Sequence, residues 1–312
     1  MPLTLSLHTG HDANMTIANP ATGEVVCYVE FEKVANQRYF KFRKEAARFS
    51  AEFKLLAWPF IERHLPHINR VNLCWVRPEQ ALVVQELLPR AKSDSSKTHH
   101  LLHAYSVYAF SKPKAGDVIV SYDGGGDLDD YFWVYRFDGK TIKAVAESKQ
   151  NLGVPYRYLG LVAPEIKSSP TFAPETNQHL AGKVMGLAPR GEIIGSFVEP
   201  LRKYYRFFTR PRSADEIKSA VLGLIRACGL KPLGRKARKE SIPEVALSRK
   251  DSENLLRTSQ EVFEQEFLRH AKSAITAKSC RRILLTGGCA LNVKLNSLIF
   301  DQTGKEVVVL PV

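Results

Sequence analysis

Cysteine is scarce in this sequence and shows no pairing pattern. The five cysteines lie far apart and none forms a C-x-x-C pair, which argues against a disulfide framework or a cysteine-rich zinc site and favours a reducing cytosol. No apolar run approaches the roughly 18 residues that a membrane span needs, and no basic and apolar leader opens the chain. We therefore expect a cytoplasmic protein without a membrane partner.

Acidic residues are too few to balance the basic ones. The 312 residues include 45 Lys and Arg against 32 Asp and Glu, which gives a net charge of +13. This excess predicts an anionic partner, such as a nucleotide, a nucleic acid or an acidic surface. With 44% hydrophobic residues, the chain can bury a sizeable core, in two domains or in one domain of two lobes.

The same order of strands and helices is predicted twice. Alternating and β-branched apolar runs predict strands, and apolar residues on one helical face predict helices. In the first half the predicted elements are strands at 3–8, 13–19 and 24–31, a helix at 44–63, a strand at 71–76, and helices at 79–88 and 98–110. In the second half they are strands at 117–122, 131–137 and 142–149, a helix at 253–277, a strand at 282–286, a helix at 290–300 and a strand at 306–310. We therefore predict an α/β fold of two halves, residues 1–113 and 114–312, with a basic insert near 200–250.

Two histidines near residue 100 form a candidate metal site. His99 and His103 are four residues apart in the predicted helix at 98–110, so both imidazoles project from one face and could hold one metal ion. The other interpretation is that these histidines, with His100 between them, are surface residues or residues of the helix start. The histidines that we expect to bind no metal are His64, His67 and His179.

Two predicted strands lead directly into glycines. The strand at 117–122 is followed by Asp123, Gly124, Gly125 and Gly126. Glycine allows backbone N–H groups to approach phosphate oxygens, and an Asp at a strand end can bind a cation; a plain hairpin turn is the alternative.

The second such strand, at 282–286, leads into Gly287 and Gly288 and then into a predicted helix. This arrangement is typical of anion and nucleotide sites, although close packing of a strand against a helix would produce it as well.

Two further motifs indicate little by themselves. His11 and Asp12 follow the first strand within Gly-His-Asp-Ala, where the pair could serve the turn or act in catalysis. Lys183 belongs to the run Gly-Lys-Val-Met-Gly-Leu-Ala at 182–188, which alone predicts a tight turn with an apolar flank.

In their order along the chain, these five motifs resemble those of the O-carbamoyltransferases, the family of nodulation and antibiotic-tailoring carbamoyltransferases. The matching runs are Gly-His-Asp-Ala near 11, His-His-x-x-His-Ala near 100, Asp-Gly-Gly-Gly near 123, Lys-x-Met-Gly-Leu-Ala near 183 and Gly-Gly-x-Ala-Leu-Asn near 287. The resemblance extends from residue 5 to 311. It implies a catalytic domain similar to the tRNA threonylcarbamoyl transferase, with the actin, sugar kinase and chaperone fold of two ribonuclease H-like lobes.

The resemblance also implies a reaction, in which a carbamoyl group passes from carbamoyladenylate to an acceptor hydroxyl. The implied metal ligands are His99, His103 and Asp123, and the metal, Fe(2+) or another divalent ion, would polarise the donor. The implied catalytic residues are His11, as general base or donor orienter, and Asp12. The residues implied in donor binding are Lys33, Arg38, Gly124, Gly125, Gly126, Lys183, Gly287, Gly288 and Asn292.

The chain departs from the family pattern in three places. Where the family usually has Glu-Arg followed by Lys, this chain has Glu32, Lys33 and Arg38, and Arg and Lys differ in the geometry of their contacts. The family places a further metal-ligating Asp shortly after the strand that ends at Pro311. It also carries, further toward the C-terminus, a domain that makes carbamoyladenylate from carbamoyl phosphate and ATP. We expect that a longer chain or a second polypeptide supplies both parts.

The segment 202–250 bears on the acceptor. It holds fourteen Lys or Arg and four acidic residues, with Tyr204, Tyr205, Phe207 and Phe208 among the first arginines. Interleaved basic and aromatic side chains suit phosphates and stacked bases, so this segment predicts a nucleotide or nucleic-acid acceptor. The alternative is a solvated insert with a buried aromatic anchor. Three other functions stay open: transfer to a small sugar or antibiotic, a tRNA threonylcarbamoyl-type transferase, and a nucleotide-binding module without activity.

Overall fold

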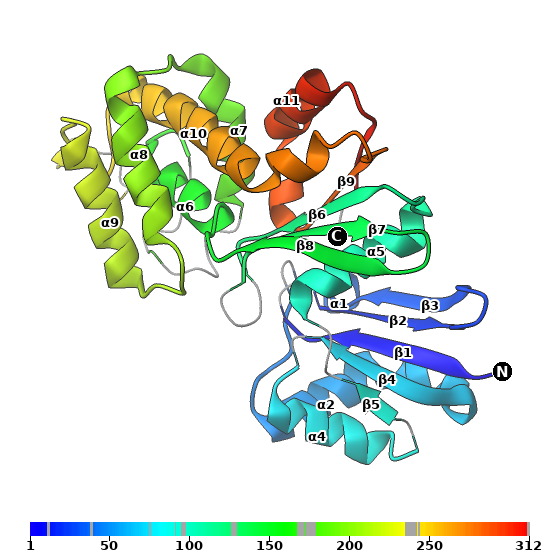
Figure 1. The fold of residues 1–312 in the computed structure, drawn as a ribbon. Helices are drawn as coiled ribbons and strands as arrows, with labels where there is room; N and C mark the ends of the chain where they lie inside the picture. Colours follow the sequence, from blue (N-terminus) through cyan, green and yellow to red (C-terminus); the bar gives the residue numbers. More distant parts are fainter. Residues whose placement is uncertain are drawn as a thin grey trace. The chain divides into compact units, whose positions relative to one another are not determined.

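The chain forms two compact units, Met1–Leu102 and His103–Val312, each with a five-stranded sheet and its own buried core (Figure 1). The division lies inside helix α5 (His99–Ser111), whereas the sequence placed it after residue 113. Among the residues described, no helix has both the length and the apolar character needed to cross a membrane. The computed structural model describes residues 1–10, 13–37, 40–74, 76–90, 92–94, 98–125, 130–166, 172, 179–234, 242 and 244–310.

The sheet of the first unit has β1 at its centre. Its strands are β1 (Leu3–His8), β2 (Asn14–Ala18), β3 (Val25–Glu30), β4 (Ile68–Cys74) and β5 (Lys92–Asp94), in the order β3-β2-β1-β4-β5. Strand β1 is antiparallel to β2 and parallel to β4. Leu3, Leu5 and Leu7 are buried while the residues between them are half-buried, because successive side chains of a strand point to opposite faces. The predicted alternation is confirmed.

Phenylalanines fill much of the first unit's core. Phe31 begins helix α1 (Phe31–Val34), and Phe49 and Phe53 lie on one face of helix α2 (Ala46–Leu56). Together with Phe40 and Phe42 they form a chain of tilted and edge-to-face ring contacts, with centroids 4.8–6.4 Å apart. Such contacts add stability beyond the apolar area that the rings bury.

The single helix predicted at 44–63 is wrong. The chain forms α2, then α3 (Trp58–Ile61) and a 3-10 helix, η1 (Glu62–His67). Pro59 has no N–H to donate to Leu55, as a continuous helix would require, so α2 ends and a new helix begins with the proline in its first turn. Helix α4 (Pro78–Leu87) matches its predicted place.

The sheet of the second unit repeats the strand order of the first. Its strands are β6 (Val118–Tyr122), β7 (Phe132–Phe137), β8 (Ile142–Ser148), β9 (Ile283–Thr286) and β10 (Val307–Val309), in the order β10-β9-β6-β7-β8. Again the first strand in the chain is central, antiparallel to the second and parallel to the fourth. Strands β6 and β9 are buried along their whole length, as their uninterrupted apolar runs predict. The two-lobed prediction is confirmed.

Helices make up most of the rest of the second unit. They are α6 (Gly153–Tyr158), α7 (Leu180–Leu187), α8 (Gly195–Phe207), α9 (Ala214–Ala227), α10 (Arg249–Ile275) and α11 (Val293–Thr303), with 3-10 helices η3 (Leu159–Val162), η5 (Ala188–Arg190) and η7 (Gly288–Leu291). Figure 1 shows α10 packed along α7 and α8. Buried residues of the three helices belong to the same hydrophobic core.

The segment predicted as a weakly periodic insert is helical over much of its length. In α8 the apolar residues Phe197, Leu201 and Tyr205 lie four residues apart and are buried. In α9 a similar set, Ile217, Val221 and Ile225, is buried. Charged residues lie between these positions, so the helical spacing of the apolar residues was not recognised in the sequence. These apolar residues form the buried face of each helix.

Candidate metal centre and the glycine turns beside it

Helix α5 places the two predicted histidine ligands on successive turns. Leu101 N donates to Thr98 Oγ1 at 3.4 Å at the helix start. His99 is buried and His103 is 12% exposed at its side chain. The helix is continuous through both residues, so their separation of four positions puts the imidazoles on one face.

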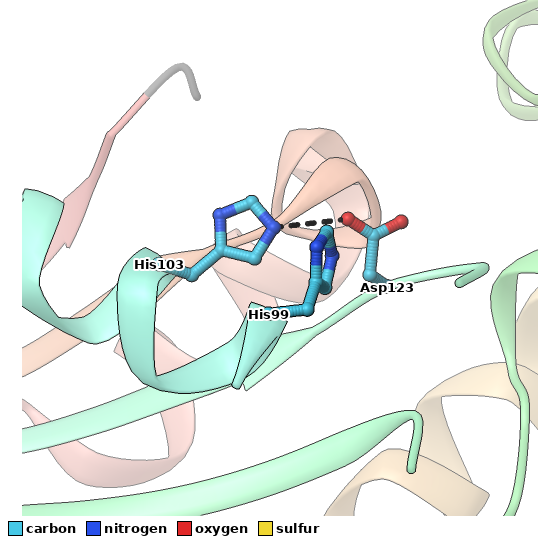
Figure 2. Close-up of side chains that lie close together, drawn as sticks. All are labelled: His99, His103 and Asp123. Carbon is cyan, nitrogen blue, oxygen red and sulfur yellow. Dashed lines mark hydrogen bonds and ion pairs between the residues drawn. The ribbon is translucent and has the colours of Figure 1, made fainter. Parts of the chain in front are cut away.

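Asp123 follows β6 and completes the cluster. Its Oδ2 lies 3.2 Å from His103 Nε2, and one ligand atom from each of His99, His103 and Asp123 lies within 4.8 Å of the others. Figure 2 shows the two imidazoles and the carboxylate converging on one place. The structure therefore brings together the three side chains that the sequence singled out.

This donor set fits a divalent metal. Two ligands bound at about 2.1 Å in tetrahedral geometry lie about 3.4 Å apart, close to the 3.2 Å between His103 and Asp123. Two histidines and one carboxylate on one side of a metal are typical of mononuclear non-haem iron(II), with other coordination positions left open.

Backbone N–H groups hold the Asp123 carboxylate in place. Gly124 N donates to Oδ1 at 2.5 Å, and Gly288 N donates to Oδ2 at 3.1 Å. Gly288 is 165 positions away in sequence and follows β9, which pairs with β6 in parallel. The second glycine motif therefore supports the metal-ligand candidate directly, a role that the sequence did not reveal.

Gly287 is needed because the backbone there is crowded and left-handed. Its φ is +89°, and a Cβ atom would lie 2.5 Å from the Tyr122 carbonyl oxygen. L-residues rarely adopt this conformation, and this contact is with main chain that cannot move aside. The close approach brings Gly288 N within reach of Asp123.

The turn after Asp123 is fastened to α6. Asn151 Nδ2 donates to the Gly124 carbonyl oxygen at 2.9 Å, and Val154 N donates to Asn151 Oδ1 at 2.9 Å. A Cβ on Gly153 would lie 2.6 Å from Cys289 Sγ and 3.1 Å from Gly124. Sequence reasoning missed Asn151 and Gly153; their signal was an Asn-Leu-Gly run one residue after the strand predicted at 142–149.

Asn292 is engaged inside the protein. Its Oδ1 accepts from Leu295 N at 3.1 Å and so caps α11. Its amide also exchanges two hydrogen bonds of 3.1 Å with Gln260 of α10, whose Oε1 accepts from Tyr156 OH at 2.6 Å. The side chain thus ties α6, α10 and α11 together, and its predicted contact with a nucleoside stays a prediction.

Some of the other predicted site residues are described by the structure, and the rest lie outside the described residues. Lys33 is exposed on α1, 3.6 Å from Glu32, and Lys183 is exposed on α7; Gly125 is half-buried in the turn after Asp123. The predicted residues outside the described part are His11, Asp12, Arg38 and Gly126. Their roles stay predictions.

Two solved structures share the fold across almost the whole chain. Component A of the (R)-2-hydroxyglutaryl-CoA dehydratase of Acidaminococcus fermentans aligns over 100% of this chain and 92% of its own, with a TM-score of 0.51 and 12% identity. The activator of the 2-hydroxyisocaproyl-CoA dehydratase of Clostridium difficile, with bound ADPNP, aligns over 99% and 89%, with a TM-score of 0.52 and 11% identity. The chain therefore has the fold of actin-like ATPases and sugar kinases, as predicted.

Within that fold class, the sequence identifies the family. The model of the carbamoyltransferase N-terminus matches residues 79–312, which is more than half of the chain and includes the histidine motif and both glycine turns. The chain belongs to the carbamoyltransferase family and is a transferase. No curated protein matches its sequence significantly.

Proposed function

We propose that this chain transfers a carbamoyl group from carbamoyladenylate to an acceptor hydroxyl, with a divalent metal, iron(II), held by His99, His103 and Asp123. The observation that supports this most strongly is the convergence of these three side chains in a member of the carbamoyltransferase family. A nucleotide donor suits the fold, since the activator from Clostridium difficile binds ADPNP on it.

The protein's own groups prepare the site for a charged donor. The two N–H groups on Asp123 fix the orientation of its carboxylate, as outer-sphere hydrogen bonds do for metal ligands in general. A metal held there would supply positive charge that polarises the donor. Without a side chain, Gly125 would let phosphate oxygens approach the main chain of this turn.

The proposed transfer is a substitution at the carbamoyl carbon. The acceptor oxygen forms a bond to that carbon, the bond from the carbon to the phosphate oxygen breaks, and AMP leaves with the electron pair. The proton of the acceptor hydroxyl passes to a general base, for which His11 is our candidate.

For the acceptor we propose a small hydroxylated molecule. Tyr204, Tyr205 and Phe208 are buried in the core, so the sequence argument that aromatics of this segment stack on bases is wrong for these three. Arg212 lies 3.8 Å above the fourth ring, that of Phe207. Four of the fourteen basic residues, Arg235, Lys236, Arg238 and Lys239, lie outside the described residues.

Several basic side chains of this segment also have partners within the chain. Arg210 and Arg212 lie 2.8 and 3.1 Å from the Glu216 carboxylate. Arg206 lies 3.7 Å from Glu266. Pairing of this kind lowers the positive charge available to a nucleic acid, which is the second reason for preferring a small acceptor.

Metal content tests the metal centre. Elemental analysis of the purified chain reconstituted with Fe(2+) under anaerobic conditions should give about one ion per chain, and His103→Ala should weaken binding by about tenfold or more because one of few protein ligands is lost. His67→Ala, at an exposed histidine of η1, is the matched control and should bind as the unchanged chain does. Equal metal content in the His103→Ala and unchanged proteins would refute the proposed centre.

Product analysis tests the transfer. We propose that an adenylate-forming domain or subunit supplies the donor, so the chain should carbamoylate an acceptor only when that domain, ATP and carbamoyl phosphate are all present. Mass spectrometry of sugar, antibiotic, DNA and RNA acceptors offered in parallel would identify the product. Carbamoylation of the oligonucleotides alone would contradict a small acceptor, and formation of carbamoyladenylate by the chain alone would contradict the partner.

A further inference from the structure

Arg157 lies on the short helix that is fastened to the turn after Asp123. Asn151 joins the start of α6 to Gly124 by two hydrogen bonds of 2.9 Å. Gly153 packs so closely on Gly124 that a Cβ would lie 3.1 Å from it. The first turn of α6 and the glycine turn are therefore one packed unit.

Arg157 shares a face of α6 with the residues that contact the glycine turn. Arg157 is four positions after Gly153 and three after Val154, whose Cγ2 would lie 3.5 Å from a Cβ on Gly124. Residues with these spacings share a face of a helix, and helical side chains lean toward the N-terminal end. The Arg157 side chain therefore starts from the face of α6 that contacts Gly124.

Charge effects on a neighbouring thiol agree with this position. Burial raises the pKa of Cys289 well above its usual value, the negative charge of Asp123 raises it further, and the positive charge of Arg157 lowers it. Cys289 directly follows Gly288, which donates to Asp123. A thiol next to the candidate metal centre is thus within electrostatic reach of both Asp123 and Arg157.

Arg157 has no anionic partner in the part of the chain that the structure describes. Its Nε is buried without a hydrogen-bond acceptor, and its Cζ lies 5.0 Å from the centroid of the Tyr158 ring. Arg282, which is also half-buried, is paired instead with Asp117 at 2.5 Å. A buried N–H without an acceptor is costly, and an anionic ligand would remove that cost.

We propose that Arg157 binds the phosphate of the nucleotide donor beside the Gly124–Gly125 turn. The planar fork of a guanidinium matches two phosphate oxygens, and the Tyr158 ring beneath it restricts its plane. The assignment rests on the proposed function, since it takes the donor to be a nucleotide. Arg157 would hold the leaving phosphate, and a metal held by His99, His103 and Asp123 would polarise the same donor.

Comparison of AMP with adenosine isolates the phosphate contact. Calorimetric titration of the unchanged chain should show AMP bound about tenfold or more tightly than adenosine. Arg157→Gln should remove most of this preference and leave adenosine affinity unchanged, and Arg157→Lys should keep part of it. Arg226→Gln, at an exposed arginine of α9, is the control and should keep all of it.

Thermal unfolding separates binding from a structural role. Because Arg157 lacks an acid partner among the described residues, Arg157→Gln should leave the melting temperature unchanged or slightly higher; a lower melting temperature with unchanged preference for AMP would overturn the inference. Equal AMP affinity of Arg157→Gln and the unchanged chain would overturn it while leaving the proposed function intact. Failure of the unchanged chain to bind either ligand would overturn the nucleotide donor itself.

Discussion

At the scale of single residues, the site depends on a main-chain crossing more than on any one side chain. The backbone of Gly287 passes so close to the Tyr122 carbonyl that no Cβ fits. That approach places Gly288 N at 3.1 Å from Asp123 Oδ2. A ligand candidate from one strand is thus oriented by the turn that follows the neighbouring strand.

Gly287→Ala is therefore expected to destabilise the chain by about 2 kcal/mol or more, because it adds a clash with main chain to the strain of a positive φ. Gly304→Ala is the matched control: Gly304 also has a positive φ, +62°, but its Cβ would meet nothing within 4 Å, so only about 1 kcal/mol should be lost. Urea unfolding measures both. Equal losses in the two variants would show that the crossing is looser than described.

The sequence predicted some residues of the candidate site and missed others, for a physical reason. His99 and His103 could be proposed as a pair because a helix fixes side chains four residues apart. The bonds to Asp123 from Gly288 and to Gly124 from Asn151 span 165 and 27 positions. No local pattern encodes such contacts, because they exist only once β6, β9 and α6 have packed.

At the scale of elements, α9 shows how an exposed charge can define a helix end. Ser213 Oγ accepts from Glu216 N at 3.2 Å, and Glu216 Oε2 accepts from Ser213 N at 2.9 Å. This reciprocal pair is a capping box. The hydrogen bond from the Ser213 backbone, with smaller effects of Arg212 and Arg210, lowers the pKa of Glu216 to about 2.

Glu216→Gln should lower the melting temperature at pH 7 by an amount that shrinks in acid. A carboxyl with a pKa of 4.5 unfolded and about 2 folded stabilises the folded state fully above pH 4.5, and this contribution is lost as pH falls through 2. The melting temperatures of the two proteins should therefore converge between pH 4.5 and 2. A difference that stays constant over this range would contradict the assignment, and Asp215→Asn, without that pair of bonds, is the control.

The strands were easier to predict than the helices of the basic segment at 202–250. Strands with clear alternation or long apolar runs were found at nearly their true bounds, since burial on one or both faces leaves that pattern. The helices α8 and α9 were missed because charged residues lie between their apolar ones, although the apolar residues recur at helical spacing. Packing against α10, which no local signal reports, decides their structure.

At the scale of the whole molecule, the two-lobed fold could be predicted because the order of elements repeats, even though the halves share no obvious sequence identity. The sequence did not predict the side-chain hydrogen bonds between the long helix α10 and the end of strand β8. In the second unit His270 of α10 lies 3.0 Å from Gln150 Oε1 and 3.4 Å from Ser148 Oγ, at the end of β8. Burial, together with the charge of Arg269, lowers the pKa of His270 to about 4, against a smaller opposing effect of Glu266.

His270 should make the stability of the protein depend on pH. Between pH 6.5 and about 4 the unfolded chain protonates this imidazole and the folded chain does not, so the free energy of unfolding falls as pH falls through this window. His270→Gln should remove part of that slope, on the order of 1 kcal/mol between pH 7 and 4.5 once solvent screening is allowed for. Urea unfolding at the two pH values measures it. A slope as steep in His270→Gln as in the unchanged protein would contradict the assignment.

The repeated strand order has a historical meaning. Two sheets with the same order and the same strand directions are the arrangement that duplication and fusion of one ancestral gene would produce. Each half has its own buried core. The turn after the first strand then diverged, to Thr-Gly-His-Asp in one copy and to Asp-Gly-Gly-Gly in the other. The same position of the repeat thus carries two different sets of chemical groups: an imidazole and a carboxylate in the first half, a carboxylate and three glycines in the second.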